Sequence, residues 1–417
     1  MQHRKRGPAR FGRPPGPTRH RSTARVRCRY HPGQGGTGLD RSFAFDLHET
    51  SGAFGDLGTL LPLVIGAVAV GGLAATPVLL GFGVFYIATA LVYRVPVPVQ
   101  PMKAVAAVLL AHEVSAGSVA VAGVAVGAVL LVLGATGWID RLGRLVPHSV
   151  LAGLQLGLGI ALALVALRLM GDTPLVSVLA LSLLALLIAA RRLPATLVFL
   201  GLAVAVGWAA GLPGVDMPEG TGAPWTAPSW PGLDAVRLGV GALALPQLSL
   251  TLTNAILLTA LVAQDLHGER AARVTPRRLC LTSGLANLAL APLGALPMCH
   301  GAGGVAAHYR FGARTGGAPL LLGATLLGLA LLPGGWGMAL IASVPAAALG
   351  ALLMVTAVQL AASRRLIDCR PSCRPVIAAT AAATVLLNPF AGLVVGAVAE
   401  AARAALVGRR RPRDRAL

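Results

Sequence analysis

Long apolar stretches recur along almost the whole chain, and this recurrence restricts the possible folds more than any other feature. From about Phe54 to Leu406, runs of mainly Ala, Leu, Val and Gly alternate with short polar gaps. A helix that crosses a bilayer needs roughly 20 apolar residues. Only 12% of the 417 residues are charged, whereas soluble proteins carry about 25%. We therefore expect an all-α polytopic membrane protein rather than several soluble domains.

The apolar pattern divides into two groups of seven candidate transmembrane segments, some of them short. The first group covers residues 53–70, 76–93, 100–112, 117–137, 148–169, 174–190 and 194–211. The second covers residues 238–263, 278–296, 300–310, 318–333, 336–361, 375–388 and 390–407. An odd number of spans per group makes the second group enter the membrane from the opposite side. The pattern therefore predicts a 7+7 inverted repeat.

The distribution of basic residues indicates orientation in a membrane rather than a nucleic-acid surface. The net charge is +20, but eleven of the 35 Lys and Arg precede residue 42 and five lie between Arg409 and Arg415. Most others fall in alternate gaps between the spans, as expected for cytoplasmic loops. We expect both termini in the cytoplasm, a location in the inner (plasma) membrane, the lipid bilayer as partner and no nucleic acid.

Residues 1–44 differ in composition from the rest of the chain. Arg, Pro and Gly dominate there and no apolar period appears, which predicts a disordered cytoplasmic extension. Residues 45–417 are expected to form a single membrane domain. The sequence contains no Walker motif, GxSxG or HExxH, so we expect no enzyme, catalytic residue, cofactor or metal site.

The third candidate span begins with a sequence that cannot form a continuous helix. It reads PVPVQPMKAVAA from Pro96, and each proline lacks an N–H and disfavours helix before it. We expect extended chain to Val99 and a half-helix that starts near Pro101. Such a start offers free N–H groups and a positive dipole end to an anion. The candidate substrate contacts here are Gln100, Pro101, Met102 and Lys103. Lys103 alternatively reaches an interface or pairs with a structural carboxylate.

The tenth candidate span has a similar start at the equivalent place in the second group. It reads PMCHGAGGVAA from Pro297; both segments are short, open with Pro and polar residues, and run into Val-Ala-Ala. Glycines let a ligand approach the backbone, and a histidine is a donor that titrates near neutral pH. The candidate contacts are Cys299, His300 and Gly301. Alternatively, His300 is structural and Cys299 only fills space.

Spans one and eight, which are also equivalent, carry further polar residues. Asp56 and Thr59 lie in span one, and a carboxylate in a membrane is costly and therefore a functional hypothesis. Asp56 either carries a proton or holds Lys103 in place. In span eight, Gln247, Thr251 and Asn254 share one helix face. They either contact a ligand or form helix–helix hydrogen bonds.

Four motifs together resemble the signatures of the molybdate transporter family, relatives of the sulfate permeases. They are FGDLGTLLP at 54–62, PVPVQPMK at 96–103, LPQLSLTLTN at 245–254, and PMCHGAGG at 297–304 followed by AHYRFGAR at 307–314. The resemblance covers about 45–410. It implies the seven-plus-seven fold of sulfate and uracil permeases, with substrate held between half-helices three and ten.

The resemblance also implies that the spans divide into a core and a gate, and it implies an activity. Spans within 53–137 and 238–333 would form a core, and spans within 148–211 and 336–407 a gate that often forms a homodimer contact. The expected function is secondary active import of molybdate by alternating access, with Asp56 or His300 as proton-coupling residues. Tungstate and sulfate are alternative substrates. A sulfate permease, a nucleobase–proton symporter and a passive anion channel are the alternative functions; span eight lacks the buried Glu of a nucleobase site.

Overall fold

The computed structural model describes residues 42–139, 147–190, 195–212, 231–332, 343–362, 366 and 369–409. Residues 1–41 of the expected extension lie outside these ranges. Residues 42–44 are held by the membrane domain, because the Gly316 N–H donates to the Ser42 carbonyl and the Ala44 N–H donates to Thr315 Oγ1.

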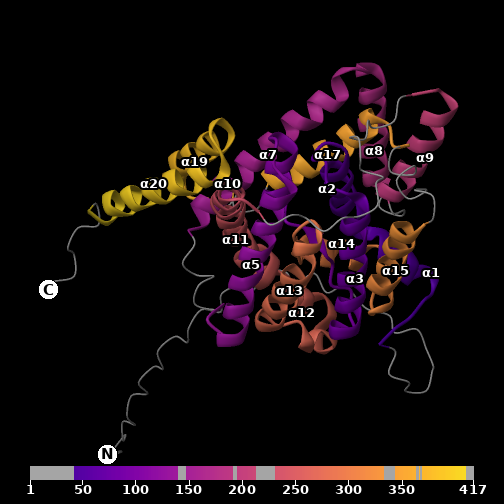
Figure 1. Cartoon of the computed structure of the whole chain (residues 1–417), viewed down its shortest axis with the longest axis horizontal. Coiled ribbons are helices and arrows are strands. Elements are labelled where there is room, and N and C mark those ends of the chain that lie inside the picture. Colours follow the sequence, from indigo (N-terminus) through magenta and orange to yellow (C-terminus); the bar gives the residue numbers. More distant parts are fainter. Residues whose placement is uncertain are drawn as a thin grey trace, which may run out of the picture. The chain divides into compact units, whose positions relative to one another are not determined.

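The described chain is almost entirely helical (Figure 1). Its α-helices are α1 (Leu47–Ala53), α2 (Leu57–Ala69), α3 (Ala75–Tyr93), α4 (Lys103–Ala111), α5 (Ala116–Thr136), α7 (His148–Gly171), α8 (Pro174–Ala190), α9 (Ala195–Ala209), α10 (Leu233–Leu238), α11 (Leu245–Leu250), α12 (Thr259–His267), α13 (Pro276–Leu290), α14 (Ala302–Arg310), α15 (Gly317–Leu331), α17 (Ala346–Ala361), α19 (Arg374–Leu386) and α20 (Pro389–Arg409). Short 3₁₀ helices are η1 (Phe54–Asp56), η4 (Gly268–Arg273), η5 (Ala291–Leu293) and η7 (Pro371–Cys373). Two π-helical stretches, η2 (Gly239–Ala244) and η3 (Thr251–Leu258), lie between α10 and α12.

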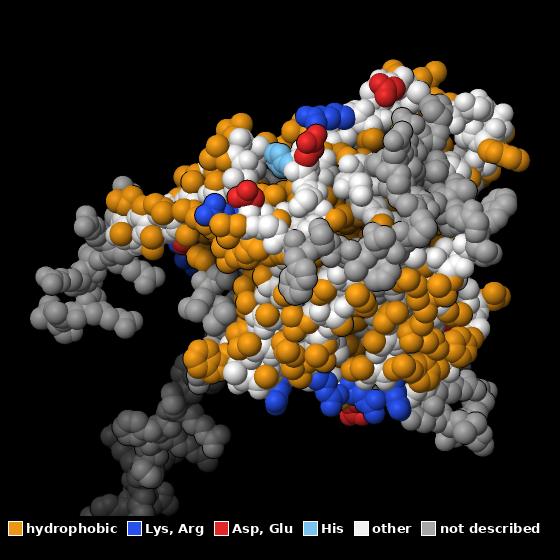
Figure 2. Space-filling view, viewed as in Figure 1, with side chains coloured by type: hydrophobic (Ala, Val, Ile, Leu, Met, Phe, Trp, Pro, Cys, Tyr) orange, Lys and Arg blue, Asp and Glu red, His pale blue; other side chains and the backbone are white. Residues whose placement is uncertain are grey.

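The helices have the length and surface of a multi-pass membrane protein. Six helical segments of the described chain are long and apolar enough to cross a bilayer, and four more are shorter apolar helices. Large apolar side chains such as Leu175, Leu186 and Trp208 are exposed, which suits contact with lipid rather than water. Figure 2 shows apolar side chains over much of one face and Lys and Arg gathered along its lower edge.

Two very short strands join the segments that the sequence identifies as broken spans. β1 (Gln100–Pro101) pairs antiparallel with β2 (Met298–Cys299), with Gln100 opposite Cys299 and Pro101 opposite Met298. The Met102 N–H then donates to the Pro297 carbonyl at 2.9 Å. Because this pairing keeps Pro101 extended, α4 begins at Lys103, two residues later than the expected start. The half-helix α14 begins directly after Gly301.

Close helix crossings are built on glycine in two places. Gly83 of α3 meets Gly323 of α15, and Gly127 of α5 meets Gly284 of α13. At each crossing, a Cβ on either glycine would lie only 2.9–3.0 Å from the other glycine's carbonyl oxygen. Small residues let helix backbones approach this closely, which is a main source of packing energy in membranes.

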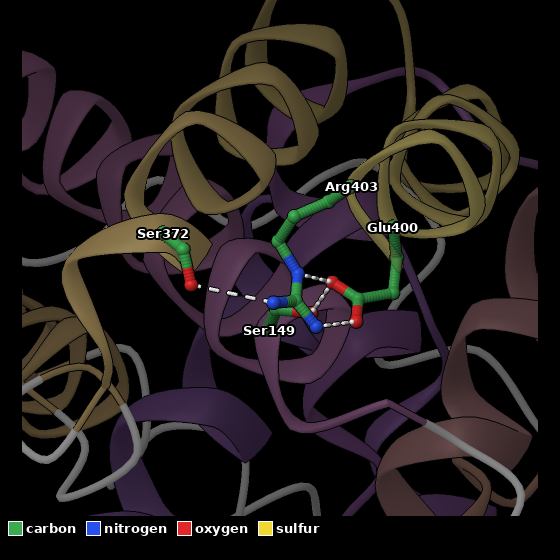
Figure 3. A network of polar contacts seen from close by, with 4 residues as sticks. All are labelled: Ser149, Ser372, Glu400 and Arg403. Carbon is green, nitrogen blue, oxygen red and sulfur yellow. Dashed lines mark hydrogen bonds and ion pairs between the residues drawn. The ribbon is translucent and has the colours of Figure 1, made fainter. Parts of the chain in front are cut away.

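The remaining long helices pack around α7. This helix contacts α17 and α19, and α19 lies beside α20 (Figure 1). At the N-terminal end of α7, a polar network joins it to α20 (Figure 3). Ser149 Oγ donates to Glu400 Oε2 at 2.7 Å, and Arg403 Nε donates to the same oxygen at 2.9 Å. The pairing of Glu400 with Arg403 thus fixes α20 against α7 and η7, where Arg403 also reaches Ser372.

Candidate functional site

A cavity of about 590 Å³ lies where the two half-helices begin. Asp56, Thr59, Gln100, Lys103 and Asn254 line it. A second cavity of about 20 Å³ shares Lys103 and Asn254 with the first and therefore lies next to it. The second cavity is also lined by four further residues expected from the sequence, Gln247, Thr251, Cys299 and His300. The larger cavity easily accommodates a small oxyanion, whereas the smaller one holds about one water molecule.

Gln100 links the buried carboxylate to the lysine. Its Nε2 donates to both oxygens of Asp56, at 2.7 and 2.8 Å, and its Oε1 accepts from Lys103 Nζ at 3.2 Å. Asp56 therefore holds Lys103 through Gln100 rather than by direct contact. The Lys103 ammonium group has three N–H donors, and one of them bonds Gln100. The others remain available to a ligand in the cavity.

Two glycines at the start of α14 make room for this chain of contacts. A Cβ at Gly301 would collide with Gln100 Oε1, and one at Gly304 would lie 2.6 Å from Asp56 Oδ2. Gly303, by contrast, lines the larger cavity and has nothing within 4 Å of its Cβ position. Pro101, Met102 and Gly301 are not among the residues that line the two cavities; they build the strand pairing and the start of α14.

We expect Gly304→Ala to weaken ligand binding by about tenfold, because the added methyl separates Gln100 from Asp56 and disturbs a charge-assisted hydrogen bond. Gly303→Ala is the matched control and should change affinity less than about threefold, since its methyl enters open space. Equilibrium binding to the two purified variants measures both effects. Equal affinities for the two variants would contradict this account of Gly304.

Gln247 and Thr251 form helix–helix and intrahelical hydrogen bonds. Gln247 Oε1 accepts from the Ala104 N–H at 2.8 Å, and its Nε2 donates to Thr251 Oγ1 at 2.8 Å. Gln247 therefore caps the first turn of α4 and fixes its direction. Asn254, in the π-helical stretch η3, lines both cavities. A π-helical stretch at a functional site is a frequent arrangement.

His300 is held by the scaffold on both sides of its ring. Nδ1 lies 2.9 Å from the Pro98 carbonyl oxygen, and Nε2 lies 3.1 Å from Thr282 Oγ1. A carbonyl oxygen only accepts, so Nδ1 carries the proton. The ring also packs against Phe85 and Tyr93. His300 thus anchors the extended segment before α4 while its edge borders the smaller cavity.

Three cavity residues were not predicted from the sequence. Gln155 of α7 lines both cavities, and Gln359 of α17 and Arg310 of α14 line the larger one. Gln155 carried a usable signal, because it is the single amide in the apolar run of α7. Lys103 and Arg310 outweigh the one carboxylate, Asp56, among the described lining residues. The site therefore favours an anion electrostatically.

Comparisons with known proteins identify relatives of this chain. A family model described as "Molybdate transporter of MFS superfamily" matches residues 48–162 and 239–360. Molybdate transporter 1 of Arabidopsis thaliana is 30% identical over 376 residues, which cover 78% of this chain and 81% of that protein.

Solved structures show the same fold at low sequence identity. The transmembrane domain of a cyanobacterial bicarbonate transporter, BicA, superimposes with a TM-score of 0.62 at 18% identity, covering 84% of this chain and 96% of that one. The murine anion transporter Slc26a9 gives 0.62 at 12% identity, covering 88% and 69%. The relatives identified by sequence are transporters, not enzymes. The extent of the family match and the identity to the Arabidopsis protein show that this chain belongs to the molybdate transporter family.

Proposed function

We propose that this anion transporter imports molybdate by alternating access and binds it in the cavity between the starts of α4 and α14. The observation that carries the proposal is the position of Lys103. It is the first residue of α4, it lines both cavities, and its ammonium group is oriented by Gln100. A full positive charge at the positive end of a helix dipole is suited to a tetrahedral dianion. The family membership supports molybdate as that dianion.

We infer further that the chain has fourteen spans arranged as a 7+7 inverted repeat. In a 7+7 repeat, the second spans α3 and α13 correspond to each other, and so do the fourth spans α5 and α15. The α3–α15 contact therefore corresponds to the α13–α5 contact. These are the two crossings made by reciprocal glycines. In the same way, β1 corresponds to β2, and the half-helix α4 corresponds to the half-helix α14; both half-helices have nine residues. These correspondences support the repeat, whose axis would lie in the membrane plane.

The same proposal divides the chain into a core and a gate. The core spans lie within 53–137 and 238–333 and include both half-helices. The gate spans lie within 148–211 and 336–407 and include α7 and the two helices that pack on it, α17 and α19. Movement of the gate against the core would open the cavity to each side in turn, and a homodimer would form through the gate.

We propose a plasma-membrane location with both termini in the cytoplasm, on the basis of the arginine distribution. Arg270, Arg273, Arg277 and Arg278 lie around η4 and the start of α13, and basic segments favour the cytoplasmic side. Single cysteines placed in the 264–277 loop should not react with an impermeant thiol reagent added to intact cells, but should react after lysis. Efficient labelling from outside would reverse the orientation.

The proposed activity is tested by uptake of radiolabelled molybdate into liposomes that contain the purified protein. We expect saturable uptake that unlabelled molybdate and tungstate inhibit more strongly than sulfate. Liposomes without protein are the control. Uptake no greater than in that control would contradict transport of molybdate. Equal inhibition by sulfate would indicate a general oxyanion permease, and uptake that does not saturate would indicate a passive channel.

A further inference from the structure

Gln155 occupies an unusual position for a polar side chain. It lies in the long apolar helix α7 and is only 5% exposed. Its Oε1 is buried and has no hydrogen-bond partner in the part of the chain that the structure describes. Buried polar atoms in proteins are nearly always paired, so an unpaired one needs an explanation.

The surroundings of Gln155 show which groups share the cavity with its amide. It lines both cavities, together with Lys103 and Asn254. Lys103 and Asn254 belong to α4 and η3, whereas Gln155 belongs to α7, which also contacts α4 but packs mainly on α17 and α19. The cavity that contains the proposed anion site is therefore bordered by polar groups from two separate sets of helices.

The chemistry of an amide suits an oxyanion at this place. A glutamine amide has two N–H donors on its nitrogen, and the torsion that carries it is soft and roughly two-fold. Because no hydrogen bond fixes Oε1, the amide is free to turn its NH₂ group toward the cavity. Such a donor is neutral, so it binds an anion without adding charge to a site that already contains Lys103.

We propose that Gln155 binds the transported oxyanion directly through its amide NH₂ group. The contact comes from α7, on a different set of helices from Lys103, and it rests on the proposed function as a molybdate transporter. The residues that bind the anion thus come both from α4 and η3 and from α7. A bound anion joins the two, and movement of α7 away from α4 breaks this contact.

Binding of radiolabelled molybdate to the purified full-length protein tests the proposal. Gln155→Leu keeps the size of the side chain and removes its donors, so affinity should fall about tenfold. Gln155→Glu adds a negative charge beside the dianion and should reduce affinity further, by about 50-fold or more. Each variant is compared only when it elutes as a single peak in gel filtration. Leucine suits an apolar helix, so Gln155→Leu remains informative even where Gln155→Glu does not fold.

Gln264 provides the matched control, because it lies in α12, is exposed and lines neither of the two cavities. Gln264→Leu and Gln264→Glu should change affinity less than about threefold, since water screens charges there. Wild-type affinity in Gln155→Leu, or equal losses in the two glutamate variants, would overturn the role of Gln155. Absence of molybdate binding to the wild-type protein would instead overturn the proposed function itself.

Discussion

Lys103→Gln is expected to weaken molybdate binding by about 10- to 100-fold, which corresponds to the roughly 1.5–3 kcal/mol of a charge-assisted hydrogen bond. Lys103 is the first residue of α4 and borders both cavities. Glutamine retains a hydrogen-bond donor there but removes the positive charge. Titration of the purified variant with radiolabelled molybdate measures the loss.

Two other variants show whether position as well as charge matters. Arg310→Gln removes a positive charge from the same cavity, but at the C-terminal end of α14. It should weaken binding, but less than Lys103→Gln does, because Arg310 lies away from the two half-helix starts. Lys103→Arg keeps the charge but not the shape of the donor and should give an intermediate loss. Unchanged molybdate affinity in a folded Lys103→Gln protein would falsify the role of Lys103.

Asp56→Asn is expected to abolish proton-driven accumulation of molybdate while leaving molybdate exchange across the membrane. Moving a dianion into a cell with a negative interior costs about 2.3 kcal/mol per charge per 100 mV, or roughly 4.6 kcal/mol in all at 100 mV. Uptake without a coupled cation would therefore limit accumulation by more than about a thousandfold. We propose at least two protons per molybdate, with Asp56 as one carrier.

The structure favours Asp56 over His300 as that carrier. Asp56 lines the larger cavity and is bonded to Gln100, which also contacts Lys103. His300, by contrast, borders only the smaller cavity, and its Nδ1–H is held by the Pro98 carbonyl. Uptake into liposomes under an imposed inward proton gradient, with a protonophore control, measures the coupling. We expect His300→Gln to keep the response that Asp56→Asn loses. Persistence of the response in both variants would place the carrier elsewhere, and a wild-type protein that ignores the gradient would refute proton coupling.

The local pattern of the sequence predicted the helices and the two broken spans well. Each of the fourteen candidate segments contains a described helix, and Pro96, Pro98 and Pro101 correctly indicated extended chain before α4. These features depend on neighbouring residues alone. Proline lacks an N–H and apolar runs have a countable length, so periodicity and composition suffice to locate them.

The hydrogen-bond network of the site could not be predicted in the same way. Gln100 lies between Asp56, 44 positions earlier, and Lys103, while Gln247 caps a helix 143 positions away. Such pairings depend on how the helices pack, and a single sequence contains no periodic signal for them. The close approach of Gly301 to Gln100 could not be predicted for the same reason. Gln155 was overlooked, although a lone amide in an apolar helix is itself a signal.

The central claim, that an oxyanion binds between the starts of α4 and α14, is tested most directly by an experimental structure of the protein with tungstate. Tungstate is a tetrahedral dianion like molybdate, and its heavy atom scatters strongly. We predict one strong peak in the cavity lined by Lys103, Gln100 and Asn254, within about 4 Å of Lys103 Nζ, as for an ion pair. A peak elsewhere, or none in that cavity at saturating tungstate, would contradict the account.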